Sequence, residues 1–144
     1  MKTRRLKETG WTFGSHTWGH IRLDSRPLES VQRDTVRWAE EVGSLVGPTN
    51  ILFYPHGGRP DGDDWHSTGP VFQYLQSQGF RIFASVGINS FSYIKKDISA
   101  VICDRLHPDG TTLRNGKALE WYSQFYDARE IIDLDVRPDL GVTW

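Results

Sequence analysis

The sequence predicts an α/β fold with a mainly parallel sheet. Short apolar runs alternate with longer segments whose apolar residues recur every three or four positions, and glycine or proline separates them. Strands that alternate with helices are typical of β-α-β units, in which neighbouring strands run parallel. With 144 residues and no internal repeat, the chain has the length of one domain, and we expect a single domain over residues 1–144.

The first expected element is the end of an amphipathic helix over residues 1–10, in which Leu6 faces inward and Gly10 ends the helix. A strand is expected next, over residues 11–14, with the sequence Trp-Thr-Phe-Gly. A domain usually begins with a complete element, so an opening in the middle of a helix leads us to expect a truncated domain.

A long helix is expected over residues 28–45. We expect Asp24 or Ser25 to cap it, with Pro27 in its first turn, and Gly47-Pro48 to end it. The charged residues of this segment, Asp34 among them, are expected to face water. The residues that form one buried stripe at helical spacing are Leu28, Val31, Thr35, Trp38, Val42 and Leu45.

The middle of the chain repeats this alternation. A buried strand is expected over residues 51–54, a loop at its end over residues 55–58, and a long Gly- and Asp-rich loop over residues 59–69. A short helix over residues 70–78 and a strand over residues 81–86 follow. Residues 87–97 fit either a loop or a short helix.

The last part contains a strand over residues 99–106, a turn over residues 108–110, a helix over residues 117–125 and a final strand over residues 131–134. About four to five strands are therefore expected, too few to close a barrel.

Composition excludes some functions. The chain has 17 Lys and Arg against 18 Asp and Glu, without a basic stripe beyond its first residues, so we expect no nucleic-acid partner. Cys103 is the only cysteine, which rules out an intrachain disulfide, and its apolar neighbours predict a buried thiol in a strand. We find no signal peptide and no apolar stretch long enough to cross a membrane, and the localisation is left open.

His16 and His20 are the candidate metal ligands. Four positions along an extended strand span roughly 13 Å, so the chain must turn if both side chains are to share one ion. Gly19 permits such a turn where a strand passes into a loop. The alternative is that both are ordinary loop histidines held by hydrogen bonds.

Residues 10–20, Gly-Trp-Thr-Phe-Gly-Ser-His-Thr-Trp-Gly-His, resemble the second motif of the polysaccharide deacetylases, carbohydrate esterase family 4. That motif is His-Ser/Thr-x-x-His, and His16, Thr17 and His20 match it. The resemblance implies that His16 and His20 bind a divalent metal, usually zinc. It also implies a distorted (β/α) barrel, of which this chain is the latter part, and metal-dependent removal of N-acetyl groups from a polysaccharide substrate.

The segment Phe53-Tyr54-Pro55-His56-Gly57 resembles the family's third motif, Arg-x-Pro-Tyr-Gly, with Pro55 and Gly57 retained. The resemblance implies that Tyr54, Pro55, His56 and Gly57 line the substrate pocket, and that the His56 backbone N–H faces the developing oxyanion. The alternative is that His56 is simply a loop histidine in a Pro-Gly turn.

The family's first motif, Thr-Phe-Asp-Asp-Gly, supplies the general base and the third metal ligand and has no counterpart before Trp11. We therefore expect little or no activity from this chain alone. Acidic and histidine side chains of the loop after His56 mainly fit turns, although one of them could replace the missing ligand: Asp61, Asp63, Asp64 and His66.

The last two motifs of the family are poorly matched. The fourth contains an Asp and would fall near residues 85–88, where there is no acid. The fifth, Leu-x-His, implies His107 as the general acid, although a position before a Pro-Asp-Gly turn also suits a hairpin residue.

Two other functions remain open. A carbohydrate-binding or structural module could keep the fold without turnover and stack sugars on Trp18, Trp65, Trp121 and Tyr122. Alternatively, the open sheet edge of a partial barrel could pair two copies into a homo-oligomer.

Overall fold

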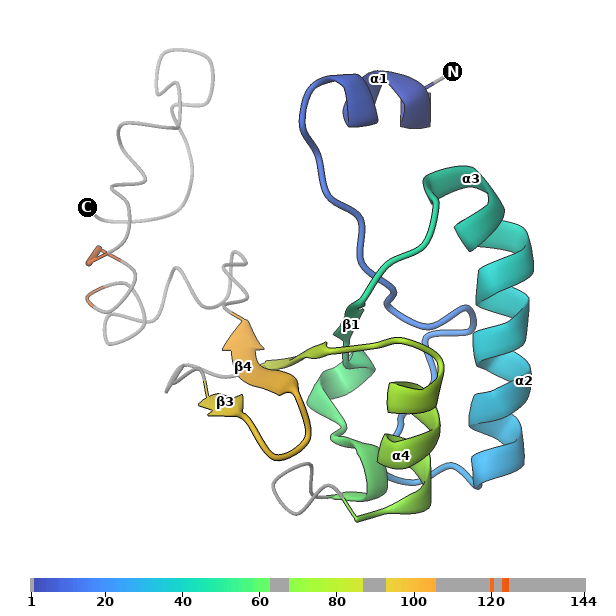
Figure 1. Ribbon diagram of the computed structural model, residues 1–144, viewed down its shortest axis with the longest axis vertical. Helices are drawn as coiled ribbons and strands as arrows, with labels where there is room; N and C mark the ends of the chain where they lie inside the picture. The colour runs from blue at the N-terminus through green and yellow to red at the C-terminus, as the bar shows by residue number, and fades with distance from the viewer. Residues whose placement is uncertain (1, 63–67, 87–92, 106–119, 121–122, 125–144) are drawn as a thin grey trace, which may run out of the picture. The chain divides into compact units, whose positions relative to one another are not determined.

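The computed structural model describes residues 2–62, 68–86, 93–105, 120 and 123–124 (Figure 1). The chain divides into two units, Met1–Arg105 and Leu106–Trp144, and the helices and strands below all lie in the first. In chain order they are α1 (Lys2–Glu8), α2 (Leu28–Trp38), the π-helical η1 (Ala39–Gly43), α3 (Ser44–Val46), β1 (Ile51–Phe53), the 3-10 turns η2 (Pro55–Gly57) and η3 (Pro60–Gly62), α4 (Pro70–Ser77), β2 (Ile82–Val86), β3 (Tyr93–Lys95) and β4 (Ala100–Arg105).

The described strands form one four-stranded sheet in the order β1-β2-β4-β3. β1 pairs parallel with β2, and β2 pairs parallel with β4, with Phe83 of β2 opposite both Leu52 and Ile102. β3, in the segment for which the sequence left loop and helix open, is antiparallel to β4. The α/β class and the mainly parallel sheet are confirmed, but the sheet is open and a barrel is not shown.

The hydrophobic core lies between this sheet and the helices α2 and α4, which are side by side (Figure 1). Both helices bury apolar side chains, because their apolar residues recur at helical spacing. The buried residues of the hydrophobic core are Leu23, Val31, Leu52, Tyr54, Val71, Phe72, Leu75, Phe80, Phe83, Ala100 and Ile102.

The strand expected over residues 11–14 is wrong. Only Ser15 pairs with the sheet, through a single parallel bridge to Leu52. Its N–H donates to the Ile51 carbonyl at 2.9 Å, and its own carbonyl accepts from the Phe53 N–H at 2.8 Å. A Cβ on Gly14 would lie 2.5 Å from the Phe53 ring, so this position lets the chain cross close to β1 without adding a strand.

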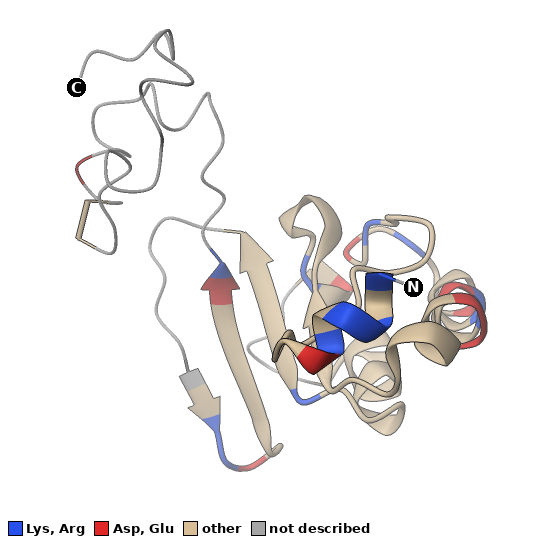
Figure 2. Ribbon diagram, turned by 90° about the horizontal axis from the view of Figure 1, so that it is seen from above, with Lys and Arg blue, Asp and Glu red and all other residues tan. Residues whose placement is uncertain are grey.

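The helix expected at the start exists as α1, but the inward role of Leu6 is wrong, since α1 buries none of its residues. Charged residues of both signs are spread over the described elements, and α1 carries a group of basic residues (Figure 2). Two of them, Arg4 and Arg5, pair with Glu8 at the surface.

The long helix is confirmed as a continuous run of α2, η1 and α3 from Leu28 to Val46. Its cap differs from the expectation, because Pro27 occupies the N-cap position and makes no side-chain cap hydrogen bond. The predicted stripe fails at Leu45, which is 59% exposed. The π-helical turn η1 changes the number of residues per turn, so positions beyond it leave the buried face.

The strand with Cys103 is confirmed as β4, and the thiol there is half-buried, with Sγ 3.7 Å from the Phe83 carbonyl oxygen. The turn, helix and strand expected over residues 108–110, 117–125 and 131–134 lie outside the described residues, apart from isolated positions. Within the described part of the chain, no helix has the length and apolarity needed to span a membrane.

Candidate functional site

Three histidine rings lie together at the end of β1. The ring centroids of His16 and His20 are 4.8 Å apart, and those of His20 and His56 are 4.5 Å apart, both pairs edge to face. His16 directly follows the Ser15 bridge to β1, and His56 lies in η2 just after β1. The sequence therefore located the first pair, but it offered only the backbone of His56.

The chain turns between His16 and His20, as it would have to if both side chains were to share one ion. The left-handed backbone falls on Thr17 (φ 61°) and His20 (φ 51°), not on Gly19. Gly19 is needed for another reason, since a Cβ there would lie 3.1 Å from an Asp34 carboxylate oxygen. The Thr17 hydroxyl closes the turn by accepting a hydrogen bond from the Ile21 N–H at 3.1 Å.

The His16 ring is held in one tautomer. Its Nδ1 is 2.8 Å from the Phe53 carbonyl oxygen. A carbonyl oxygen can only accept, so Nδ1 carries the hydrogen and Nε2 keeps its lone pair. An imidazole whose other nitrogen donates to a carbonyl is the usual form of a metal-binding histidine.

His20 and His56 are exposed, whereas His16 is half-buried. Desolvation lowers the pKa of His20, and the positive charges of His16, His56 and Arg105 lower this pKa further. Neutral imidazole is thereby favoured at His20 near neutral pH, and neutral imidazole is the form that binds metals.

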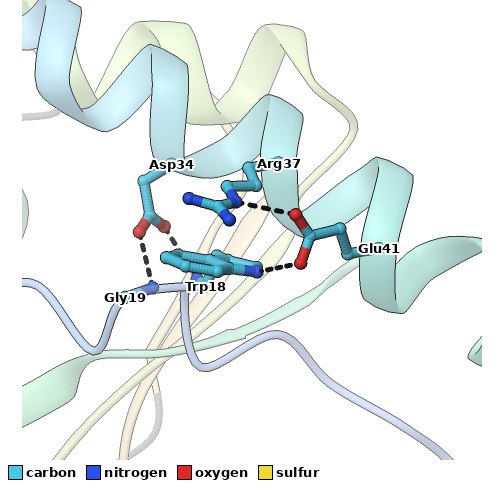
Figure 3. A network of polar contacts seen from close by, with 5 residues as sticks. All are labelled: Trp18, Gly19, Asp34, Arg37 and Glu41. Carbon is cyan, nitrogen blue, oxygen red and sulfur yellow. Dashed lines mark hydrogen bonds and ion pairs between the residues drawn. The ribbon is translucent and has the colours of Figure 1, made fainter.

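Helix α2 holds the segment between the two histidines. The buried Asp34 carboxylate accepts the backbone N–H groups of Trp18 at 2.8 Å and Gly19 at 2.7 Å (Figure 3). The expectation that Asp34 faces water is wrong. Asp34 lies three residues after Val31 and four before Trp38, both buried, and this spacing was the signal that could have revealed it.

The Trp18 side chain contacts both α2, through Arg37, and the following η1, through Glu41. Its indole N–H donates to Glu41 at 2.8 Å, and Arg37 both donates to Glu41 at 2.7 Å and lies over the indole ring at 3.5 Å from its centroid (Figure 3). One face of the Trp18 ring is thus covered by Arg37, although the residue is 40% exposed. The other proposed stacking residues, Trp65, Trp121 and Tyr122, lie outside the described residues.

The four residues of the third-motif loop differ in exposure. Tyr54 and Pro55 are buried, Tyr54 as part of the hydrophobic core. His56 and Gly57 have left-handed backbone, with φ values of 55° and 68°, and the Gly57 carbonyl accepts from the Ser85 hydroxyl at 3.0 Å. His56 is therefore the side chain that this loop presents to solvent.

Asp61 has a structural role. Its two carboxylate oxygens accept the N–H groups of Val71 at 3.2 Å and Phe72 at 2.9 Å, at the start of α4. The other candidates for a third ligand, Asp63, Asp64 and His66, and the candidate acid His107 lie outside the described residues.

The family model described as Polysaccharide deacetylase matches residues 2–81, more than half of the chain. The chain belongs to the polysaccharide deacetylase family. The matched region contains all three clustered histidines and Asp34. No curated protein and no solved structure matches the chain.

The histidine cluster fits a zinc-type ion in donor chemistry. Imidazole nitrogen is a common zinc ligand, and two imidazoles on one tetrahedral zinc have ring centroids about 5 Å apart, close to the observed separations. The side chains do not yet converge on one point: within the described ranges, no three His, Cys, Asp or Glu residues are arranged to hold a metal ion. The three imidazoles therefore match zinc in donor type but not in arrangement.

Proposed function

We propose that this chain carries the histidine side of a metal-dependent deacetylase site that acts on N-acetyl groups of a carbohydrate polymer. The observation that carries the proposal is the close pair His16 and His20, on a loop clamped by Asp34, in a chain of the polysaccharide deacetylase family. When bound, a divalent ion such as zinc would activate a water molecule and polarise the amide carbonyl.

Each residue of the cluster has a defined part in this proposal. His16 would bind the metal through Nε2, because its Nδ1–H is committed to the Phe53 carbonyl. His20 would bind as a neutral imidazole, which its lowered pKa favours. The His56 backbone N–H would face the oxyanion that develops when water attacks the carbonyl, a role that depends on the backbone of η2.

We further propose that this chain alone has low turnover. Deacetylation needs a general base as well as a metal, and the Thr-Phe-Asp-Asp-Gly motif that supplies the base in the family does not occur in these 144 residues. The alternative is a carbohydrate-binding or structural module without turnover. Of its proposed stacking residues, the structure describes Trp18, which is partly exposed.

The test combines metal binding with acetate release. Zinc affinity would be measured by calorimetry for the unaltered chain, for a His16→Ala/His20→Ala double variant and for Glu29→Ala, an exposed control. We expect zinc binding that the double variant loses and the control keeps. Equal zinc affinity in all three would overturn the metal assignment.

Acetate release from an N-acetylglucosamine oligomer would be followed in the same samples. We expect zinc-dependent release to be slow, and absent from the double variant. Rapid zinc-dependent turnover would overturn the proposed impairment. Oligomer binding that needs neither zinc nor the two histidines, without any acetate release, would replace the enzyme by the binding module.

A further inference from the structure

A groove opens at the amino ends of the parallel strands. Its volume is about 560 Å³, and two residues that line it, Pro48 and Gln78, precede β1 and β2 respectively. His56 follows β1, so the histidine cluster belongs to the opposite end of that strand. The groove is therefore a surface separate from the histidines. Helices α1 and α3 and the segment before Ser15 also contribute to its lining, through Lys7, Trp11, Phe13 and Val46.

Trp11 leaves much of its surface uncovered beside this groove. It is 65% exposed, and Leu45, the neighbour of the lining residue Val46, is 59% exposed. Large apolar side chains exposed beside a groove are typical of a surface that binds another molecule. Tryptophan is also among the residues that contribute most to affinity when a protein partner covers them.

The segment between α1 and Ser15 has an open backbone edge. The Ser15 backbone pairs with β1, and the Phe13 carbonyl accepts from the Thr49 hydroxyl at 2.7 Å, so both residues face the β1 side. Successive residues of a chain that runs beside a strand point their backbone groups to opposite sides, which directs those of Thr12 and Gly14 away from β1. Within the part of the chain that the structure describes, nothing hydrogen-bonds to the backbone of Thr12 or Gly14. Unpaired N–H and C=O groups along an edge are a template for another strand.

The charge beside this edge is positive. Helix α1 contains one acid, Glu8, and four basic residues, Lys2, Arg4, Arg5 and Lys7, although the whole chain has 17 basic and 18 acidic residues (Figure 2). Lys7 lines the groove itself. A second copy of the chain would bring another basic helix to this surface, whereas an acidic partner is attracted to it.

We propose that the groove and the open edge bind an acidic, extended peptide segment of a partner protein. The segment adds a strand beside Thr12 and Gly14, pairs with their backbone groups and covers Trp11 with its apolar side chains. Its acidic side chains lie near α1, whose positive charge selects it over neutral and basic segments. This inference does not depend on the function proposed above, because the groove and the histidines are separate surfaces.

The probe is a fluorescein-labelled peptide of about eight residues in which valine and glutamate alternate, a pattern that suits a strand. Its binding to the full chain would be measured by fluorescence anisotropy. One matched peptide replaces glutamate by lysine, and another carries N-methyl groups on its backbone nitrogens, which prevents strand pairing. We expect both to bind at least about tenfold more weakly than the glutamate peptide, whose affinity should fall as salt is added.

Variants of the chain locate the binding surface. Trp11→Ala should weaken binding of the glutamate peptide by about tenfold or more, whereas Val36→Ala, which shortens another exposed apolar side chain, should leave it unchanged. Lys7→Glu should weaken binding and reduce its dependence on salt, with Arg26→Glu as the control at another exposed position. Trp11 and Lys7 are exposed, so both variants should keep the far-UV circular dichroism of the unaltered chain.

The possible results separate the parts of this proposal. Equal affinity for the N-methylated peptide would overturn strand addition, and equal affinity for the lysine peptide would overturn the acidic partner. Absence of binding, or undiminished binding in Trp11→Ala, would overturn the groove as the site. Self-association of the chain in sedimentation velocity, lost in Trp11→Ala, would make a second copy the occupant and overturn the peptide. Zinc affinity and acetate release should be the same in Trp11→Ala and the unaltered chain, so failure of this inference leaves the proposed function standing.

Discussion

Replacing Asp34 by alanine should loosen the histidine loop and destabilise the domain. The carboxylate is 9% exposed and accepts two backbone N–H groups, from Trp18 at 2.8 Å and from Gly19 at 2.7 Å. Hydrogen bonds to a charged group contribute about 1.5–3 kcal/mol each. Trp18 and Gly19 are exposed, so water can partly replace the lost acceptor, and we expect the free energy of unfolding to fall by about 2–4 kcal/mol.

This loss would be measured by urea denaturation followed by circular dichroism, on the unaltered chain, Asp34→Ala, Asp34→Asn and Glu40→Ala. Asparagine keeps one acceptor oxygen, so Asp34→Asn should lose about half as much as Asp34→Ala. Glu40 is exposed, and its substitution should change the free energy of unfolding by less than about 0.5 kcal/mol. If Asp34→Ala unfolds at the same urea concentration as Glu40→Ala, the clamp does not stabilise the loop.

Three further predictions concern the surroundings of the site. Gly14→Ala should destabilise the domain by about 1–3 kcal/mol in the same urea experiment, because its Cβ would overlap the Phe53 ring. An unchanged midpoint of urea unfolding would contradict the close contact between Gly14 and Phe53. Asp61→Ala should lower the free energy of unfolding by about 1 kcal/mol, because it removes the acceptor for the first N–H groups of α4. Asp61→Asn keeps one acceptor oxygen and should lose less. Equal losses in the two variants would contradict this prediction. Burial, followed by the charge of Asp104, raises the pKa of the Cys103 thiol, so the reactive thiolate is scarce at pH 8. Alkylation of Cys103 by iodoacetamide should then be slow in the folded chain and fast in urea. Equal rates in the two conditions would refute the protection of the thiol by the fold.

The sequence predicted the elements that bury their own apolar residues. The strands around Leu52 and Phe83 and the helix that contains Val31 and Trp38 were recognisable because each pattern reports burial directly. The strand at Trp11 was wrongly predicted from an equally apolar run. Its failure depends on the crossing of Gly14 over Phe53, a contact that spacing within one segment cannot reveal.

The site was predictable to the extent that its residues are neighbours in the chain. His16 and His20 belong to one motif, so their pattern pointed to shared chemistry. Asp34 and His56 reach the same place from other elements, and their roles depend on which helix and which strand lie beside the loop. The position of Asp34 at helical spacing from Val31 was a usable signal for its burial, whereas nothing in the sequence predicted that the His56 ring would contact His20.

The clamp and the ligands should affect metal binding in different ways. Asp34 controls where the segment between His16 and His20 lies, so its loss should lower zinc affinity while the number of nitrogen donors stays the same. In the proposed function His20 contributes a donor itself, so its loss should change the cobalt(II) spectrum as well as the affinity. If Asp34→Ala alters the spectrum as much as His20→Ala does, Asp34 does more than position the two histidines, and the distinction between positioning and ligation would be wrong.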